Sequence, residues 1–292
     1  MKSHHLLSFL IALNIFSGYN CSAQNSSPLT TVAIDSTNYG QNDKAGKYYN
    51  IRGFKMYVEQ YGTGVPLLLI HGNGGSINSF KNQIPFFAGK YRVIIADSRA
   101  QGRSVDLTDS LSYEMMTDDY AALLSILKID SANVIGWSDG GIIGLMLAMK
   151  YPEKVKKLAV SGANLWPDTS AINPDVLQLV RPDYLRLLSN NHKTSEEKNS
   201  EKLLRLLFEE PNIQVDSLSR IQCPTLVIGG DHDIIKEKHL MLISNHIARS
   251  YLWIVPGSGH SVPVVFKDFF NNVTYSFFTK DYRTITGDKR FN

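Results

Sequence analysis

The sequence has few cysteines and no large excess of charge of one sign. Cys21 and Cys223 are its only two cysteines, too few for a disulfide scaffold or a cysteine-based zinc cluster. The 30 basic residues nearly balance the 27 acidic ones, for a net charge of +3. The basic residues are not gathered into one run, so the composition argues against a nucleic-acid partner. The 43% share of hydrophobic residues is enough for a sizeable core.

A long apolar run is also missing. The apolar stretch near the N-terminus, residues 6–16, is about half the length that a membrane span needs. It follows Lys2 and precedes a small-x-small ending at Cys21 and Ala23, the pattern of a secretory signal peptide at residues 1–23. We therefore expect an exported, periplasmic or secreted protein with a mature charge of about +2 and with no disulfide partner for Cys223.

Two other interpretations of the N-terminus stay open, a lipoprotein acylated at Cys21 and an apolar N-terminus of a cytoplasmic protein. Residues 24–46 are rich in Ser, Thr, Asn and Gly without periodicity, which predicts a flexible leader.

Strand and helix patterns alternate through one domain at residues 47–292. An opening hairpin is expected at residues 48–61, followed by short runs that are apolar on nearly every residue, as in strands covered on both faces. These runs lie at 66–70, 93–96, 132–135, 158–160, 225–228 and 251–255. Helical spacing at 113–127, 141–149 and 263–278 predicts a doubly wound, mostly parallel α/β sheet. Residues 168–221 interrupt this rhythm and predict a helical lid of two or three helices.

A serine lies in a sharp turn between an apolar strand and an apolar helix. Residues 136–140 read GWSDG, with glycine on both sides of Ser138. In this context the motif predicts a nucleophile elbow, because glycine permits the tight turn that exposes the serine hydroxyl. A plain turn is the alternative that context disfavours.

A catalytic serine needs a general base and a carboxylate that orients it. His260 follows the last predicted strand on a glycine-rich loop, whereas His232, His239 and His246 are expected on loops or helix surfaces. The order Ser, Asp, His is the one that this architecture uses, so the acid is expected just after the strand at 225–228. Asp233 is the predicted acid, because the spacing usual in the family that these motifs resemble places it three residues beyond a glycine, here Gly230.

Two other carboxylates stay open as the acid, Asp231 beside it and Asp168 after the preceding strand. Asp231, His232 and Asp233 also resemble a set of metal ligands. Since no further ligand pattern accompanies them, no metal is expected.

Two backbone N–H groups are needed for the developing oxyanion. One is that of Asp139, the residue after the nucleophile. The other is expected from Asn73, with Gly74 as second choice, on the loop after the strand at 66–70. A dinucleotide-binding fingerprint in this loop is excluded because Ile77 stands where its third glycine belongs.

Taken together, the elbow, the His71-Gly72 loop, residues 97–104, Asp233 and His260 resemble the α/β-hydrolases of the serine type. Family members usually carry glycine where Ala100 stands. Residues 136–141, 151–152 and 161–164 are similar to the valacyclovir hydrolase (biphenyl-hydrolase-like) branch. That resemblance implies that Asp139 binds the α-amino group of a substrate; a carboxylate satisfied by neighbouring backbone is the alternative.

These features predict a serine hydrolase that cleaves a small carboxylic ester or lactone through an acyl-enzyme, without a cofactor. A small substrate is expected because the lid is short, and Trp137, Trp166 and Tyr184 are candidate pocket walls. An aminopeptidase or amidase, a carbon–carbon bond hydrolase and a non-catalytic small-molecule receptor remain alternatives. Haloalkane dehalogenases and epoxide hydrolases are disfavoured, since they have Asp at the position of Ser138. No oligomeric state is predicted.

Overall fold

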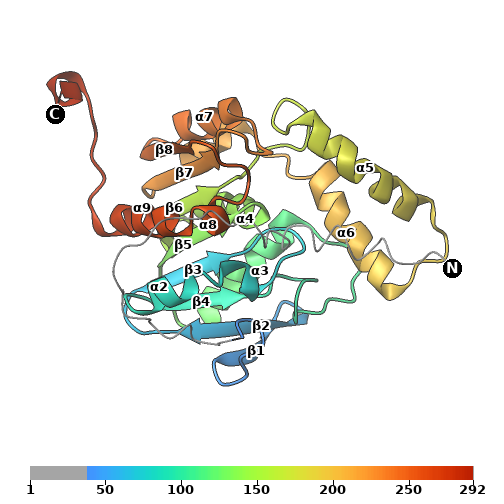
Figure 1. Cartoon of the computed structure of the whole chain (residues 1–292). Coiled ribbons are helices and arrows are strands. Elements are labelled where there is room, and N and C mark those ends of the chain that lie inside the picture. The colour runs from blue at the N-terminus through green and yellow to red at the C-terminus, as the bar shows by residue number, and fades with distance from the viewer. Residues whose placement is uncertain (1–37, 292) are drawn as a thin grey trace, which may run out of the picture. The chain divides into compact units, whose positions relative to one another are not determined.

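A computed structural model describes residues 38–291 of the chain (Figure 1). The predicted signal peptide at residues 1–23 and the first part of the predicted leader lie outside these residues. Among the helices of residues 38–291, none combines the length and the apolar character that crossing a membrane requires.

An eight-stranded sheet forms the centre of the domain, in the order β1-β2-β4-β3-β5-β6-β7-β8. The antiparallel hairpin of β1 and β2 pairs antiparallel with β4, and all remaining pairs are parallel. The predicted mostly parallel, doubly wound sheet is therefore confirmed. The strands are β1 (Gly46–Ile51), β2 (Phe54–Tyr61), β3 (Pro66–Ile70), β4 (Arg92–Ala96), β5 (Ala132–Trp137), β6 (Val155–Ser161), β7 (Thr225–Gly230) and β8 (Ser250–Val255).

Alternate residues of the central strands enter two different hydrophobic clusters, one on each face of the sheet. On β5, Val134 belongs to the first cluster and Ile135 and Trp137 to the second. Helices α3 (Tyr113–Ile126), α4 (Asp139–Lys150) and α7 (Glu237–Asn245) contribute to the first cluster. Helices α2 (Ile84–Ala88), α8 (Val262–Val265) and α9 (Lys267–Thr279) contribute to the second. Because both faces are covered, the central strands are apolar on nearly every residue, as the sequence predicts.

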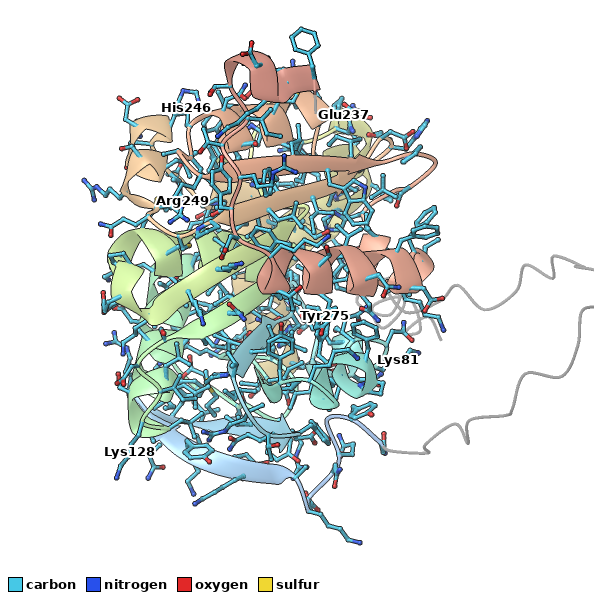
Figure 2. All side chains as sticks on the ribbon, turned by 90° about the vertical axis from the view of Figure 1, so that its left-hand side faces the viewer. Lys81, Lys128, Glu237, His246, Arg249 and Tyr275 are labelled. Carbon is cyan, nitrogen blue, oxygen red and sulfur yellow. The ribbon has the colours of Figure 1, made fainter. Side chains whose placement is uncertain are left out.

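Helix α9 packs next to α2, which fixes the chain that follows the last strand. Figure 2 shows Tyr275 between these two helices, and its ring lies edge-on to Phe86 with centroids 6.2 Å apart. The buried Gln83 side chain donates hydrogen bonds to the Pro263 carbonyl at 2.7 Å and to Asn271 Oδ1 at 3.1 Å. The segment after the predicted base, residues 261–271, is thus held against the sheet.

Residues 38–45, which the sequence places in the leader, are bonded to the domain. The buried carboxylate of Glu59 on β2 accepts the N–H groups of Gly40 and Asn42, each at 2.9 Å. The hydroxyls of Tyr57 and Tyr61 donate to the same carboxylate at 2.9 and 2.7 Å. Four donors satisfy a buried charge that has no cation beside it among the described residues, and they join residues 40–42 to the hairpin.

Two helices, α5 (Pro174–Ser189) and α6 (Ser195–Glu209), and the short 3₁₀ helix η3 (Val215–Arg220) lie in the predicted lid segment between β6 and β7. Figure 1 shows α5 and α6 side by side. α6 is bonded to the loops that follow β3 and β4. Lys202 Nζ donates to the carbonyls of Asp106 and Thr108 at 3.2 and 2.7 Å, and Asn199 Nδ2 donates to the Ala100 carbonyl at 2.8 Å.

Candidate active site

Ser138 occupies the turn between β5 and α4 in a strained backbone conformation. Its φ is 58° and its ψ is −122°, a backbone conformation that residues other than glycine rarely adopt. The turn is tight on both sides: a Cβ on Gly136 would collide with the Gly140 carbonyl, and one on Gly140 with the Ile70 carbonyl. The two flanking glycines are therefore required, and the geometry is that of a nucleophile elbow.

His260 lies within hydrogen-bond distance of both predicted partners. Its Nε2 is 2.9 Å from Ser138 Oγ, and its Nδ1 is 2.6 Å from Asp233 Oδ1. Beneath the ring, Gly162 has a φ of 63°, and a Cβ there would lie 2.6 Å from His260 Cε1. The Asp233 bond selects the tautomer with the proton on Nδ1, which leaves Nε2 free to accept a proton from the serine hydroxyl.

The Asp233 carboxylate is buried and held by backbone donors. It accepts the Gly230 N–H at 3.3 Å and the Ile235 N–H at 3.2 Å. Burial alone would raise the pKa of this carboxyl, but the adjacent imidazole and the two N–H donors outweigh it and hold the pKa below its usual range. Asp233 is therefore ionised at neutral pH, the state in which it stabilises a protonated imidazole.

The two alternative acids lie elsewhere. Asp231 accepts the N–H groups of Gly257 and Ser258 at 2.9 and 3.0 Å and pairs with His232, so it holds the loop that carries His260. Asp168 binds the side chain and the backbone N–H of Ser170. Residues 38–291 contain no group of three or more His, Cys, Asp or Glu side chains placed to hold a metal ion.

The loop after β3 passes directly beside the serine. A Cβ on Gly72 would lie 2.8 Å from Ser138 Cβ. The Asn73 N–H donates to no protein acceptor in the described part of the chain, and Asp139 is the first residue of α4, where N–H groups lack an intrahelical acceptor. Both N–H groups expected to bind the oxyanion are thus available on the elbow side of the sheet.

A neutral histidine braces this loop. His71 Nε2 accepts the Ser98 N–H at 3.0 Å, so the ring proton is on Nδ1 and is donated to the Gly72 carbonyl at 2.8 Å. Burial lowers the pKa of His71, which keeps the ring neutral. Sequence reasoning placed His71 in the motif but assigned it no role.

The Asp139 carboxyl is buried and has two side-chain donors. Asn73 Nδ2 donates to Asp139 Oδ2 at 2.9 Å, and the Tyr113 hydroxyl forms a second hydrogen bond. Asn73 Nδ2 also donates to the Leu203 carbonyl of α6 at 3.0 Å. Burial raises the pKa of Asp139 to about 6 despite these donors. The elbow, the loop after β3 and the lid therefore meet at this carboxyl.

Residues 65–210, half of the chain, match the model of the α/β-hydrolase fold family. The chain belongs to the α/β-hydrolase family. It is 27% identical to the serine hydrolase BPHL of Homo sapiens over 248 residues, 78% of this chain and 84% of that protein. It is also 27% identical to the 2-hydroxymuconate semialdehyde hydrolase of Pseudomonas sp. (strain CF600) over 239 residues, 71% of this chain and 84% of that protein.

Among solved structures, a thermophilic esterase from Thermogutta terrifontis has a TM-score of 0.68 and 23% identity. The match covers 81% of this chain and 100% of the esterase. At 23% identity, the similarity to this esterase shows the shared fold. The family match and the similarity to BPHL confirm the resemblance seen in the motifs at the level of the family.

In this α/β-hydrolase, the three predicted pocket walls all contact other protein groups. The Trp137 indole donates to the His260 carbonyl at 3.0 Å, and that of Trp166 to Ser170 Oγ at 2.7 Å. Tyr184 stacks on Phe208 with centroids 4.8 Å apart and hydrogen-bonds Glu209. Their contact with substrate stays a prediction.

His239 is not on the helix surface where we expected it. Its side chain is buried, its Nε2 accepts the Leu165 N–H at 3.0 Å, and its ring lies edge-on to Trp166. Burial lowers the pKa of His239 to about 4, so the ring is neutral. The apolar neighbours at helical spacing, Leu240 and Ile243, indicate the buried face of α7 and were the available signal.

Proposed function

We propose that this α/β-hydrolase is a serine hydrolase that cleaves a small carboxylic ester or lactone through an acyl-enzyme. The observation that carries the proposal is the relay of 2.9 Å from Ser138 Oγ to His260 Nε2 and 2.6 Å from His260 Nδ1 to Asp233 Oδ1. Three residues far apart in the chain meet in the order and at the distances that nucleophilic acyl transfer requires.

In the proposed reaction, His260 takes the proton of Ser138 as the serine oxygen attacks the substrate carbonyl. The negative charge that develops on the carbonyl oxygen is stabilised by the N–H groups of Asn73 and Asp139. His260 then protonates the leaving alcohol, and the acyl group remains on Ser138. Water attacks this acyl-enzyme in the same way, with His260 again acting as the base, and the acid is released.

A carbon–carbon bond hydrolase is the second candidate. It is favoured by the similarity to the 2-hydroxymuconate semialdehyde hydrolase, which covers 84% of that protein. The same three side chains would serve it, so the distinction depends on the substrate rather than on the relay.

A substrate panel tests the proposal. Purified protein is assayed on aryl esters, lactones, amino-acid esters, small amides and a vinylogous diketone, alongside Ser138→Ala and the control Ser244→Ala on α7. We expect turnover of esters or lactones that the control retains and Ser138→Ala loses. Preferred cleavage of the diketone would favour the second candidate. Saturable binding without turnover of any compound would instead support a receptor.

Export is a separate proposal that depends on residues 1–23, whose charged, apolar and small parts follow the secretory order. Intact mass after expression in a bacterial host tests it. A mature chain that begins at Gln24 is expected, and an uncleaved chain in the cytoplasm would contradict it.

A further inference from the structure

The residue immediately before the nucleophile is hydrogen-bonded to the main chain of the base. Trp137 Nε1 donates to the His260 carbonyl at 3.0 Å, while Ser138 Oγ, on the next residue, lies 2.9 Å from His260 Nε2. Trp137, the last residue of β5, therefore binds His260 at its carbonyl, and Ser138, the first residue of the following turn, binds it at its ring.

Strand alternation explains why a tryptophan reaches this carbonyl. Trp137 is the last residue of β5, and its side chain enters the second hydrophobic cluster, to which α2, α8 and α9 contribute. The residue is 3% exposed, and its ring lies edge-on to Phe80 with centroids 6.4 Å apart. A buried indole N–H needs an acceptor, and the loop that passes between β8 and α8 supplies one.

The other contacts of the base loop come from the loop after β7 and from Gln83, the residue before α2. Asp231 accepts the N–H groups of Gly257 and Ser258, the His232 N–H donates to the Ser258 carbonyl at 2.9 Å, and Gln83 binds the Pro263 carbonyl. These bonds fix the loop to its own side of the sheet. None of these bonds reaches β5, whereas the indole bond joins the His260 carbonyl to that strand.

We infer that Trp137 is a positioning residue, which sets the distance between His260 Nε2 and Ser138 Oγ through its hydrogen bond to the His260 carbonyl. The inference rests on the proposed serine-hydrolase function. Without the indole N–H, the His260 main chain loses its bond to β5, and the ring is then placed by its bonds to Asp233 and to the reacting Ser138 hydroxyl. Because proton transfer depends steeply on the alignment of donor and acceptor, turnover falls while substrate affinity is kept.

Two variants separate the N–H group from the bulk of the ring. Trp137→Phe removes the donor and part of the ring, and replacement of Trp137 by 3-benzothienylalanine keeps the ring size but puts sulfur in place of the N–H. Trp253→Phe on β8 is the control, because its indole N–H has no protein acceptor among residues 38–291. Turnover of an aryl ester is expressed per active site, titrated with a fluorophosphonate, so that misfolded protein does not count.

We expect both Trp137 variants to lose about tenfold in kcat with KM changed by less than about twofold, and the control to match the unsubstituted protein. Hydrogen exchange gives a second readout that needs no substrate: amides of residues 256–261 should exchange faster in both Trp137 variants than in the control. Unchanged kcat and exchange in the benzothienyl variant would overturn the inference. If the unsubstituted protein turns over no ester, the proposed function fails instead, and the exchange measurement still decides the role of Trp137.

Discussion

The buried carboxyl of Asp139 makes the stability of the protein depend on pH. Its pKa rises from an ordinary value of 3.8 to about 6 in the folded protein, chiefly through burial. Between these values the unfolded chain loses the proton before the folded chain does. The unfolded state therefore binds fewer protons in this window, and the free energy of unfolding falls as the pH rises through it.

The size of the effect follows from the two pKa values. At 1.36 kcal/mol for each unit of pKa, the interval corresponds to about 3 kcal/mol, of which about 0.5 kcal/mol is already lost at pH 4. Asp139→Asn removes the titrating group. Whatever constant difference the amide introduces, the stability of the variant relative to the unsubstituted protein should rise by about 2.5 kcal/mol between pH 4 and pH 8.

Urea unfolding followed by tryptophan fluorescence at pH 4, 5, 6, 7 and 8 measures this difference. Asp118→Asn is the control: burial would raise the pKa of Asp118, but hydrogen bonds from Lys150 and the Tyr151 hydroxyl hold it below its ordinary value, and both partners titrate above pH 8. Its difference from the unsubstituted protein should be constant from pH 5 to pH 8. A difference for Asp139→Asn that is equally flat from pH 4 to pH 8 would refute the argument that this carboxyl is desolvated in the folded state.

Three further outcomes are expected. Asp233→Asn should lower kcat for an aryl ester by about 10⁴-fold, because an amide at this position favours the wrong imidazole tautomer; a loss below tenfold, measured by initial rates, would contradict its role. Asp139→Asn should change turnover of plain and amino-acid esters by the same factor, because the hydrogen bonds from Asn73 and Tyr113 already occupy the carboxyl and an ammonium group would have to displace them. A loss confined to amino-acid esters would indicate that Asp139 binds an ammonium group. Ala100→Gly should stabilise the domain by about 0.5–1 kcal/mol in urea unfolding, since Ala100 has a φ of 64°, and a less stable variant would count against backbone strain there.

The sheet and the candidate relay could be predicted from the sequence because each depends on local patterns. Runs such as 93–96 are apolar on every residue, and GWSDG is recognisable only between such a strand and a helix. The order of Ser138, Asp233 and His260 then places all three beyond the carboxyl ends of strands, where they are found at 2.9 and 2.6 Å.

The contacts that depend on partners distant in the chain could not be predicted in this way. Glu59 binds Gly40 and Asn42 across the hairpin, so a segment without periodicity is nevertheless bonded to the domain. The indole of Trp137 has no sequence feature that marks its acceptor, which lies 123 residues further along the chain. Tyr184 stacks within the lid on Phe208 because α5 and α6 lie side by side, an arrangement that helical spacing alone does not specify.

Covalent labelling of the serine tests the central proposal most directly. Intact protein is treated with a fluorophosphonate, digested, and analysed by mass spectrometry together with Ser138→Ala and His260→Ala. We expect one phosphonyl group on the peptide that contains Ser138, no labelling in Ser138→Ala, and a labelling rate reduced by orders of magnitude in His260→Ala. An unlabelled Ser138 in the folded, unsubstituted protein, or equal labelling rates with and without the imidazole of His260, would contradict it.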